Sequence, residues 1–214
     1  MDAVLFDFTG TLFWIESAAE ALRGALGADF VHLAPRLERF GAINGSATPS
    51  ELPDHLVDVW ERRDLSRDAH RAAYSGLAIH AGLTPQQAHL VYERGTTAGA
   101  WHTYPDTLTV LRALRGTPVA LVSNIGWDPR PVLAAHGAAA LLPVLVLSDE
   151  RRVEKPDPAI FELACAELGV APERTLMVGD NADTDGAAAA IGCRFVLVDP
   201  SPDRAPNTLL RAVS

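Results

Sequence analysis

The sequence predicts an α/β fold whose core is a doubly wound parallel sheet, with a helical segment inserted close to the N-terminus. In the second half of the chain, short apolar runs alternate with helical segments of about 10 residues, which is typical of βαβ units. One further apolar run begins the chain, and residues 15–100 have helical patterns without a convincing strand pattern. We therefore expect an α/β core domain of residues 1–14 and 101–214 and a helical domain of residues 15–100.

The expected strands are short, apolar and bounded by turn residues. The first is "AVLFDF" at residues 3–8, and the others cover residues 118–124, 144–148, 175–180 and 194–199. The expected helices cover residues 104–116, 128–137, 157–169 and 185–192. Asp157 followed by a proline is typical of a helix start, and glycines such as Gly169 suit helix ends. Beyond residue 199 we expect a loop and a last helical turn.

Composition and charge argue against two classes of partner. The 214 residues carry a formal net charge of −9, whereas binding to nucleic acid or to a membrane surface needs a basic footprint. The longest apolar runs are too short to cross a membrane, and the N-terminus has no secretory signal pattern.

The two cysteines, Cys165 and Cys193, form no CxxC pair, so we expect reduced thiols in a cytoplasmic protein. A monomer and a homodimer both stay open.

Polar side chains collect where the expected strands end. They are Asp7 after the first strand, Ser123 and Asn124 after the second, Lys155 beyond the third, and Asp180 with Asp185 after the fourth. In an open α/β sheet, ligands bind beyond the carboxyl ends of the strands. A carboxylate can attack phosphorus, and two carboxylates side by side need a cation such as Mg²⁺ to offset their repulsion. A lysine can neutralise the charge on a phosphoryl group, so the set favours phosphoryl transfer.

Four short motifs carry a resemblance to a known family. "DFTGT", "LVSN", "EKPDPAIF" and "GDNADTD" resemble, in order and spacing, the four motifs of the haloacid dehalogenase (HAD) superfamily. The resemblance covers residues 1–13 and about 105–199. It implies a Rossmann-like core, and the helical insert is similar to the C1 cap of subfamily I. It also implies a Mg²⁺-dependent phosphohydrolase that acts on a small phosphorylated metabolite.

The resemblance implies a metal-binding set. Asp7 would be the nucleophile, forming an aspartyl phosphate, and also a Mg²⁺ ligand. The backbone carbonyl of Thr9 would be a second ligand. Asp180 would bind Mg²⁺, with Asp185 supporting it. A simpler interpretation of Asp180 and Asp185 is that they cap the following helix.

The resemblance also implies a set of residues that hold the substrate. Ser123 would bind the phosphoryl group, and we expect Asn124 and Lys155 to share in substrate binding. Lys155 would in addition stabilise Asp7. It is the only lysine among 18 basic residues, the others being arginines, which argues against an ordinary surface lysine.

Thr9 departs from the family pattern, because HAD phosphatases usually have an aspartate at this position. That aspartate protonates the leaving oxygen and then activates water, and threonine cannot do either near neutral pH. General acid–base catalysis contributes about 10²–10⁴ in rate. We therefore expect slow turnover of alkyl phosphates and a preference for better leaving groups, such as acyl or aryl phosphates. Glu16, just past the first motif, is a possible replacement acid.

Two other functions stay open. The chain could be a catalytically weak HAD protein with a binding or regulatory role, which the loss of the acid at position 9 favours. It could instead be a 2-haloacid dehalogenase-like hydrolase. However, dehalogenases of the family usually have a tyrosine at position 9, and their fourth motif departs from the "GDxxxxD" form that this chain keeps. The cap has no lysine, which argues against the Schiff-base mechanism of phosphonatases.

Overall fold

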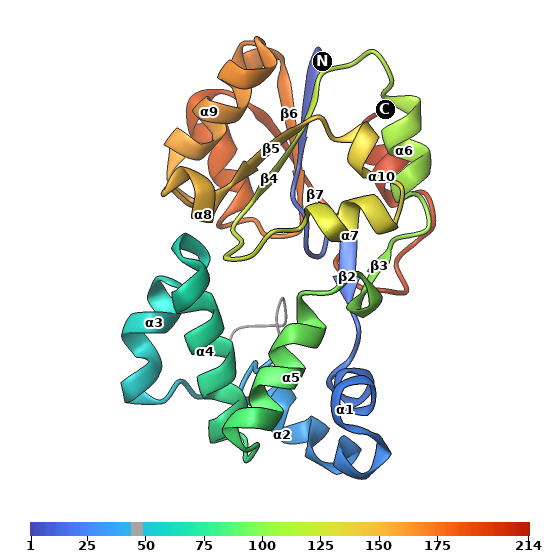
Figure 1. The fold of residues 1–214 in the computed structure, drawn as a ribbon. Coiled ribbons are helices and arrows are strands. Elements are labelled where there is room, and N and C mark those ends of the chain that lie inside the picture. Colours follow the sequence, from blue (N-terminus) through green and yellow to red (C-terminus); the bar gives the residue numbers. More distant parts are fainter. Residues whose placement is uncertain (44–48) are drawn as a thin grey trace. The chain divides into compact units, whose positions relative to one another are not determined.

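The computed structural model describes residues 1–43 and 49–214 and divides them into two compact units. The α/β unit consists of Met1–Trp14, Thr103–Ile125 and Leu133–Ser214. The helical unit consists of Ile15–His102 and Gly126–Val132. Both are drawn in Figure 1. Residues 44–48, which fall in the predicted cap, lie outside the described residues.

The α/β unit is built on a five-stranded parallel sheet. Its strands, in spatial order, are β5 (Val144–Leu147), β4 (Val119–Ser123), β1 (Ala3–Phe6), β6 (Thr175–Gly179) and β7 (Arg194–Leu197). All four residues of β1 are buried, because it is the central strand of a sheet covered on both faces. The chain leaves β1 toward β4 and β5 and later returns to β6. The carboxyl ends of β1 and β6 therefore flank the point where the winding direction reverses, the usual ligand site of such sheets.

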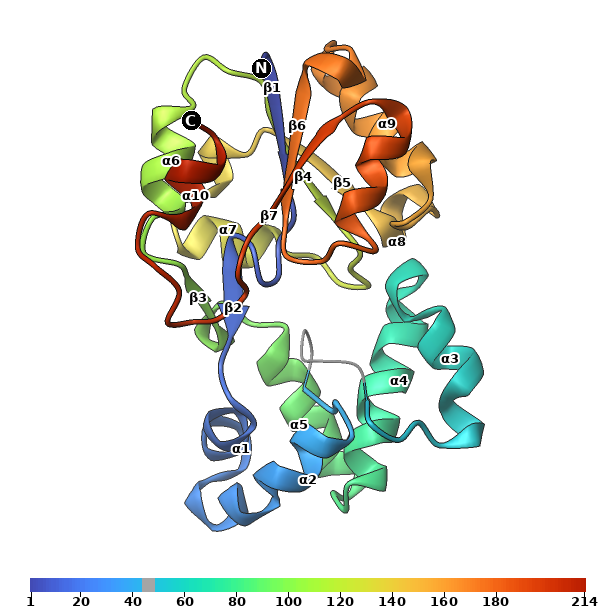
Figure 2. The ribbon, with the colours of Figure 1, turned by 180° about the vertical axis from the view of Figure 1, so that it is seen from behind.

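Helices cover both faces of this sheet, as Figures 1 and 2 show. One face carries α8 (Ser148–Arg151) and α9 (Pro158–Leu168), and the other carries α6 (Thr107–Ala113) and α10 (Thr208–Ala212). α7 (Arg130–Ala135) begins among the residues grouped with the helical unit and ends in the α/β unit. The predicted doubly wound α/β fold is confirmed.

Most predicted elements of the core form close to their expected bounds. Asp157 caps α9, its side chain accepting a hydrogen bond from the backbone N–H of Ala159 at 2.9 Å, and Gly169 ends the helix with φ 66°. One prediction differs in detail. Residues Asp185–Ile191 form a 3₁₀ helix, η7, and not an α-helix. Gly186, next to its start, lowers the α-helical propensity there.

Two short strands escape the sequence analysis. β2 (Phe13–Ile15) and β3 (Trp101–Thr103) pair in a separate two-stranded sheet. Each has three residues, too few to show the alternation by which a strand is recognised.

The other 3₁₀ helices among the described residues are η1 (Ala28–Leu33), η2 (Asp54–Leu56), η3 (Arg63–Leu65), η4 (Ala98–Ala100), η5 (Ala139–Leu141) and η6 (Pro172–Arg174).

The helical unit has its own apolar core. Its α-helices are α1 (Ala18–Leu26), α2 (Ala34–Arg39), α3 (Val57–Glu61), α4 (Arg67–His80) and α5 (Pro85–Gly95). Leu22, Leu37 and Leu77 are fully buried at the centre of this core. Capping boxes start α1 at Ser17 and α5 at Thr84, which satisfies backbone donors at both N-termini.

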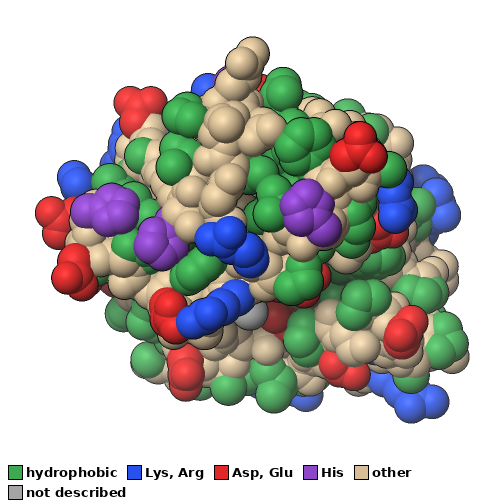
Figure 3. Space-filling view, turned by 90° about the horizontal axis from the view of Figure 1, so that it is seen from below, with side chains coloured by type: hydrophobic (Ala, Val, Ile, Leu, Met, Phe, Trp, Pro, Cys, Tyr) green, Lys and Arg blue, Asp and Glu red, His purple; other side chains and the backbone are tan. Residues whose placement is uncertain are grey.

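On the face drawn in Figure 3, basic and acidic side chains are interspersed. Among the described residues, no helix combines the length and the apolar character needed to cross a bilayer.

A buried histidine lies inside the helical unit. His70 of α4 is 1% exposed, and its Nδ1 shares a hydrogen bond of 3.0 Å with the hydroxyl of Tyr92. The ring of Tyr74 packs against it at 4.6 Å between centroids. Burial, aided by the nearby Arg63 guanidinium, lowers the pKa of His70 from 6.5 to about 3. The imidazole is therefore neutral in the folded protein over the physiological range.

We predict that this histidine makes the fold sensitive to acid. Below pH 6.5 the unfolded chain binds a proton at His70 that the folded chain does not, so the free energy of unfolding falls as the pH falls from about 6.5 toward 3, by up to about 1.4 kcal/mol per pH unit. Denaturant titrations at several pH values should show a smaller pH slope for His70→Gln. His89→Gln, at a half-exposed position on α5, is the matched control. Equal slopes for His70→Gln and the unsubstituted protein would contradict the prediction.

Candidate active site

The polar residues expected at the strand ends come together in the α/β unit. The register places Phe6 of β1 opposite Leu121 of β4 and Val178 of β6, so these strands reach the same edge of the sheet. Asp7 follows β1 directly, Ser123 is the last residue of β4, and Asp180 follows β6. Ser123 is buried. The backbone N–H of Asp7 donates to the carbonyl of Val178 at 3.1 Å, which fixes the start of the turn after β1.

The turn after β1 is tight and closes on itself. The carbonyl of Phe8 accepts hydrogen bonds from the backbone N–H groups of Leu12 and Phe13, at 3.0 and 2.9 Å. Gly10 has φ 76°, which favours glycine. A Cβ atom at this position would also lie 2.3 Å from Oδ2 of Asp180. The glycine of "DFTGT" is therefore needed both for the turn and for the close approach of Asp180.

Lys155 links two of the carboxylates. Its Nζ donates to Oδ1 of Asp7 at 2.7 Å, to Oδ1 of Asp185 at 2.6 Å and to the carbonyl of Val122 at 3.1 Å. The lysine is 4% exposed, and Asp7 and Asp185 are 7% and 0% exposed. All three ammonium donors are used, so a buried charge is fully paired and hydrogen-bonded.

Asn124 fixes the backbone of Lys155. Its side-chain Nδ2 donates to the Lys155 carbonyl, and its Oδ1 accepts from the Lys155 N–H, both at 2.7 Å. This pair of bonds ties the segment before α9 to the end of β4. The geometry gives Asn124 a positioning role. The substrate contact expected for it from the sequence stays a prediction.

Asp180 and Asp185 complete the cluster. One oxygen from each of Asp7, Asp180 and Asp185 lies within 4.8 Å of the others. Oδ2 of Asp185 accepts a hydrogen bond from the backbone N–H of Asn181 at 3.0 Å, which orients it. A Cβ atom at position 179 would lie 2.2 Å from the same oxygen, so Gly179 is what lets Asp185 approach the end of β6.

Burial and mutual repulsion shift the ionisation of these groups. Burial raises the pKa of Asp7 to about 7, although the Lys155 ammonium acts in the opposite direction. Burial also raises the pKa of Asp180, and repulsion by Asp185 adds to this. Burial acts to lower the pKa of Lys155, but the carboxylates of Asp7 and Asp185 outweigh it and raise that pKa above its ordinary value. The cluster thus holds more negative charge than one lysine can offset.

Comparison with known proteins decides the family. A family model described as "haloacid dehalogenase-like hydrolase" matches residues 1–192 of the chain. The chain belongs to this family of hydrolases. The resemblance read from the four motifs is thereby confirmed.

Relatives with two kinds of chemistry resemble this HAD hydrolase. A phosphoglycolate phosphatase of Rhodospirillum rubrum is 34% identical over 222 residues, covering 99% of this chain and 85% of the relative. An (S)-2-haloacid dehalogenase 4A of Burkholderia cepacia is 29% identical over 201 residues, covering 92% of this chain and 82% of the relative. A phosphoserine phosphatase of Thermus thermophilus is 38% identical over 100 residues, a match that spans 45% of this chain and only 40% of that relative.

A solved structure shares the fold. The L-2-haloacid dehalogenase of Xanthobacter autotrophicus superposes with a TM-score of 0.69 at 24% identity, covering 99% of this chain and 81% of that chain. At this identity the likeness concerns the fold alone. The chain is thus a HAD-like hydrolase by family, and its chemistry must be inferred from its own residues.

The carboxylate cluster of this HAD hydrolase fits a divalent cation. Mg²⁺ prefers oxygen ligands and is commonly held by one or two carboxylates. Asp7, Asp180 and Asp185 supply such oxygens. Burial and repulsion between carboxylates raise the pKa values of Asp7 and Asp180, and a nearby cation would favour their charged forms. The residues therefore fit the group that HAD phosphatases use.

Thr9 lies partly buried inside the turn after β1. Its backbone pairs with Phe13 in an isolated bridge. Thr9 follows Asp7 by two residues, but its hydroxyl does not ionise near neutral pH and cannot replace a carboxylic acid.

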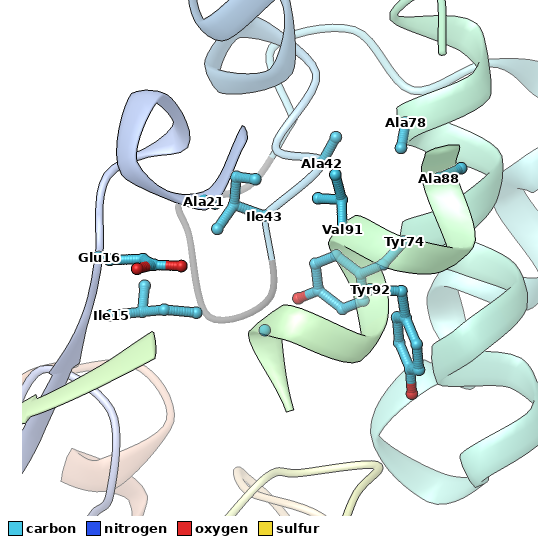
Figure 4. A pocket seen from close by; sticks show the side chains of 11 residues that line it. Ile15, Glu16, Ala21, Ala42, Ile43, Tyr74, Ala78, Ala88, Val91 and Tyr92 are labelled. Atoms are coloured by element: carbon cyan, nitrogen blue, oxygen red, sulfur yellow. The ribbon is translucent and has the colours of Figure 1, made fainter. Parts of the chain in front are cut away.

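Glu16, the possible replacement acid, has a partner inside the helical unit. Its two carboxylate oxygens accept hydrogen bonds from Nε and Nη2 of Arg94, at 2.7 and 2.6 Å, and the residue is 5% exposed. It lines the pocket of Figure 4, whose other labelled side chains are apolar or tyrosine. This bidentate ion pair gives Glu16 a structural role within the helical unit. Apart from Glu16, the pocket contains none of the site residues expected from the sequence.

One residue close to the site escaped the sequence analysis. Arg204, from the C-terminal tail, donates hydrogen bonds to the carbonyls of Gly10 and Thr11 in the turn after β1. It lies 19 residues beyond Asp185, the last acidic residue of the fourth motif, in a segment expected to be a loop, and it is one of 17 arginines in the chain. The only signal was an arginine within a stretch rich in proline, and that is too weak to predict a role.

Proposed function

We propose that the chain is a Mg²⁺-dependent phosphohydrolase that acts on a small phosphorylated metabolite through an aspartyl phosphate on Asp7. The observation that carries the proposal is the buried Lys155 held between Asp7 and Asp185, with Asp180 completing a cluster of three carboxylates. An ion pair of this kind holds a carboxylate in one orientation, as a nucleophile requires. Phosphatases acting on phosphoglycolate and phosphoserine among the relatives support a small phosphorylated substrate.

The first chemical step is assigned to Asp7. Oδ1 of Asp7 is engaged by Lys155, which leaves Oδ2 for attack on phosphorus. A bond forms between this oxygen and phosphorus while the bond from phosphorus to the leaving oxygen breaks. We assign Ser123 to the phosphoryl oxygens, and the Lys155 ammonium, whose three donors are engaged by Asp7, Asp185 and Val122, acts on these oxygens through its positive charge. When bound by Asp7, Asp180, Asp185 and the carbonyl of Thr9, Mg²⁺ would offset the repulsion between the carboxylate and the phosphoryl group.

The second step returns Asp7 to its free form. Water attacks the phosphorus, the bond to Asp7 breaks, and inorganic phosphate leaves. In HAD phosphatases the acid at position 9 assists both steps, and Thr9 supplies neither proton transfer. The leaving oxygen must therefore depart as a stable anion or take its proton from water. Acyl and aryl phosphates meet the first condition better than alkyl phosphates.

We further propose that residues 15–100 act as a helical cap domain of subfamily I type on a core of residues 1–14 and 101–214. Trp and His side chains of the cap are candidates for substrate contacts. The cytoplasmic location and the choice between monomer and homodimer stay predictions.

The 2-haloacid dehalogenases among the relatives favour one alternative, hydrolysis of a carbon–halogen bond by attack of the same carboxylate. Two features of the sequence weigh against it. Thr9 stands where dehalogenases of the family usually have tyrosine, and the "GDNADTD" motif supplies the extra carboxylates that a cation needs. A regulatory protein that binds a phosphorylated ligand without turning it over is the other alternative.

A substrate panel separates these functions. With purified protein, we expect release of phosphate from small phosphorylated metabolites when Mg²⁺ is present and no release after chelation. Acyl and aryl phosphates should react faster than alkyl phosphates, and Asp7→Asn should abolish turnover. Release of halide from 2-haloacids without Mg²⁺ would favour the dehalogenase. Ligand binding without any turnover would favour the regulatory protein.

Replacement of Thr9 tests the account of the missing acid. We predict that Thr9→Asp raises the rate of hydrolysis of a simple alkyl phosphate, by up to about 10²–10⁴, because it restores general acid–base catalysis. Thr9→Asn, similar in size and without a titratable group, is the matched control and should give no increase. If steady-state assays show the same rate for Thr9→Asp as for the unsubstituted protein, the account of Thr9 is wrong.

A further inference from the structure

The C-terminal tail places a buried guanidinium against the turn that follows β1. Nη1 of Arg204 donates to the carbonyl of Gly10 at 3.1 Å, and Nη2 donates to the carbonyl of Thr11 at 2.6 Å. These are two successive carbonyls, bound by two nitrogens of one planar group. Arg204 is 5% exposed and comes from a segment that begins after β7.

The guanidinium is itself held in place. Nη1 also donates to the carbonyl of Asp199 at 3.1 Å, and the group lies 3.4 Å from the centroid of the Tyr104 ring. The Tyr104 hydroxyl donates to the carbonyl of Pro200 at 2.6 Å, which fixes the ring against the same tail. The stacked, hydrogen-bonded arginine is therefore a rigid support and not a mobile side chain.

The support acts on the glycine of the turn. Gly10, with φ 76°, has the widest choice of backbone angles of any residue in this segment. Its carbonyl is held directly, and so is that of Thr11. Fixing these two peptide planes restricts the plane between Thr9 and Gly10, whose oxygen is the carbonyl of Thr9. The same restraint keeps Gly10 in contact with Asp180, where no Cβ atom would fit.

We propose that Arg204 is a positioning residue for the cation site, acting through the turn and not by touching the cation. It orients the carbonyl of Thr9 relative to the carboxylates of Asp7 and Asp180. The inference rests on the proposed function, because it presupposes that this cluster binds Mg²⁺. A guanidinium suits the task better than an ammonium, since its planar fork can bind two carbonyls at once.

The test is the affinity for Mg²⁺, measured by isothermal titration calorimetry without substrate. Arg204→Met keeps most of the side-chain length and removes every donor, and Arg204→Lys restores the charge without the fork. Removing a direct hydrogen-bond partner of a metal ligand typically weakens metal binding by about 10–100-fold. Arg204 acts one peptide plane further from the carbonyl of Thr9, so we expect a loss at or below the lower end of that range in Arg204→Met. The loss should be smaller in Arg204→Lys and absent in Arg211→Gln, an exposed arginine of the same tail.

Two further readouts separate positioning from a merely structural role. The rise in unfolding temperature caused by a fixed concentration of Mg²⁺ should be smaller in Arg204→Met than in the unsubstituted protein. Turnover of the same variant should recover as Mg²⁺ is raised, so that the apparent affinity for the cation changes more than the maximal rate. A structural role alone would lower stability and leave the affinity of the folded protein unchanged.

The outcomes are distinguishable. If the unsubstituted protein binds Mg²⁺ and folded Arg204→Met binds it equally well, this inference is overturned while the proposed function stands. If Arg204→Met does not fold, Arg204→Lys carries the test and must bind Mg²⁺ several-fold more weakly than the unsubstituted protein, since equal affinity overturns the inference. Failure of the unsubstituted protein to bind Mg²⁺ overturns the proposed function and this inference together.

Discussion

The site depends on one buried interaction, the ammonium of Lys155 shared between Asp7 and Asp185. Removing one partner of such a buried pair typically costs about 3–5 kcal/mol, because the other charge is left unpaired. The surrounding structure is arranged to form this interaction. Asn124 holds the backbone of the lysine, and Gly179 leaves room for the second carboxylate. The parallel register of β1, β4 and β6 then brings three separate segments to the same place.

The excess of negative charge links this interaction to function. Lys155 offsets part of the charge of the three carboxylates, and burial makes the remainder costly, as the raised pKa values of Asp7 and Asp180 show. A divalent cation relieves that cost, and so would the approach of a proton. These electrostatics support the proposed phosphoryl transfer, whereas Thr9 lacks the carboxyl group that would move protons in that reaction. In the proposed mechanism, the chain supplies groups for binding and for attack, but no group at position 9 for proton transfer.

Much of the fold could be predicted from sequence, because parallel strands buried on both faces are continuous apolar runs. The ends of these runs mark the ends of the strands, so Asp7, Lys155 and Asp180 could be predicted to lie beyond the same edge of the sheet. The three-residue strands β2 and β3 were too short to show a pattern, and η7 differs from the expected α-helix. The roles of Asn124 and Arg204 depend on contacts between segments 31 and about 190 residues apart, which no local pattern records.

The central claim is that Asp7 forms a phosphoryl intermediate whose hydrolysis is slow because Thr9 cannot activate water. The most direct measurement is mass spectrometry of protein quenched in acid during turnover of an acyl phosphate with Mg²⁺. The account predicts a phosphoryl group on Asp7 in a substantial fraction of the molecules. Steady release of phosphate with no modified Asp7, or an ester formed on Asp7 from a 2-haloacid, would contradict it.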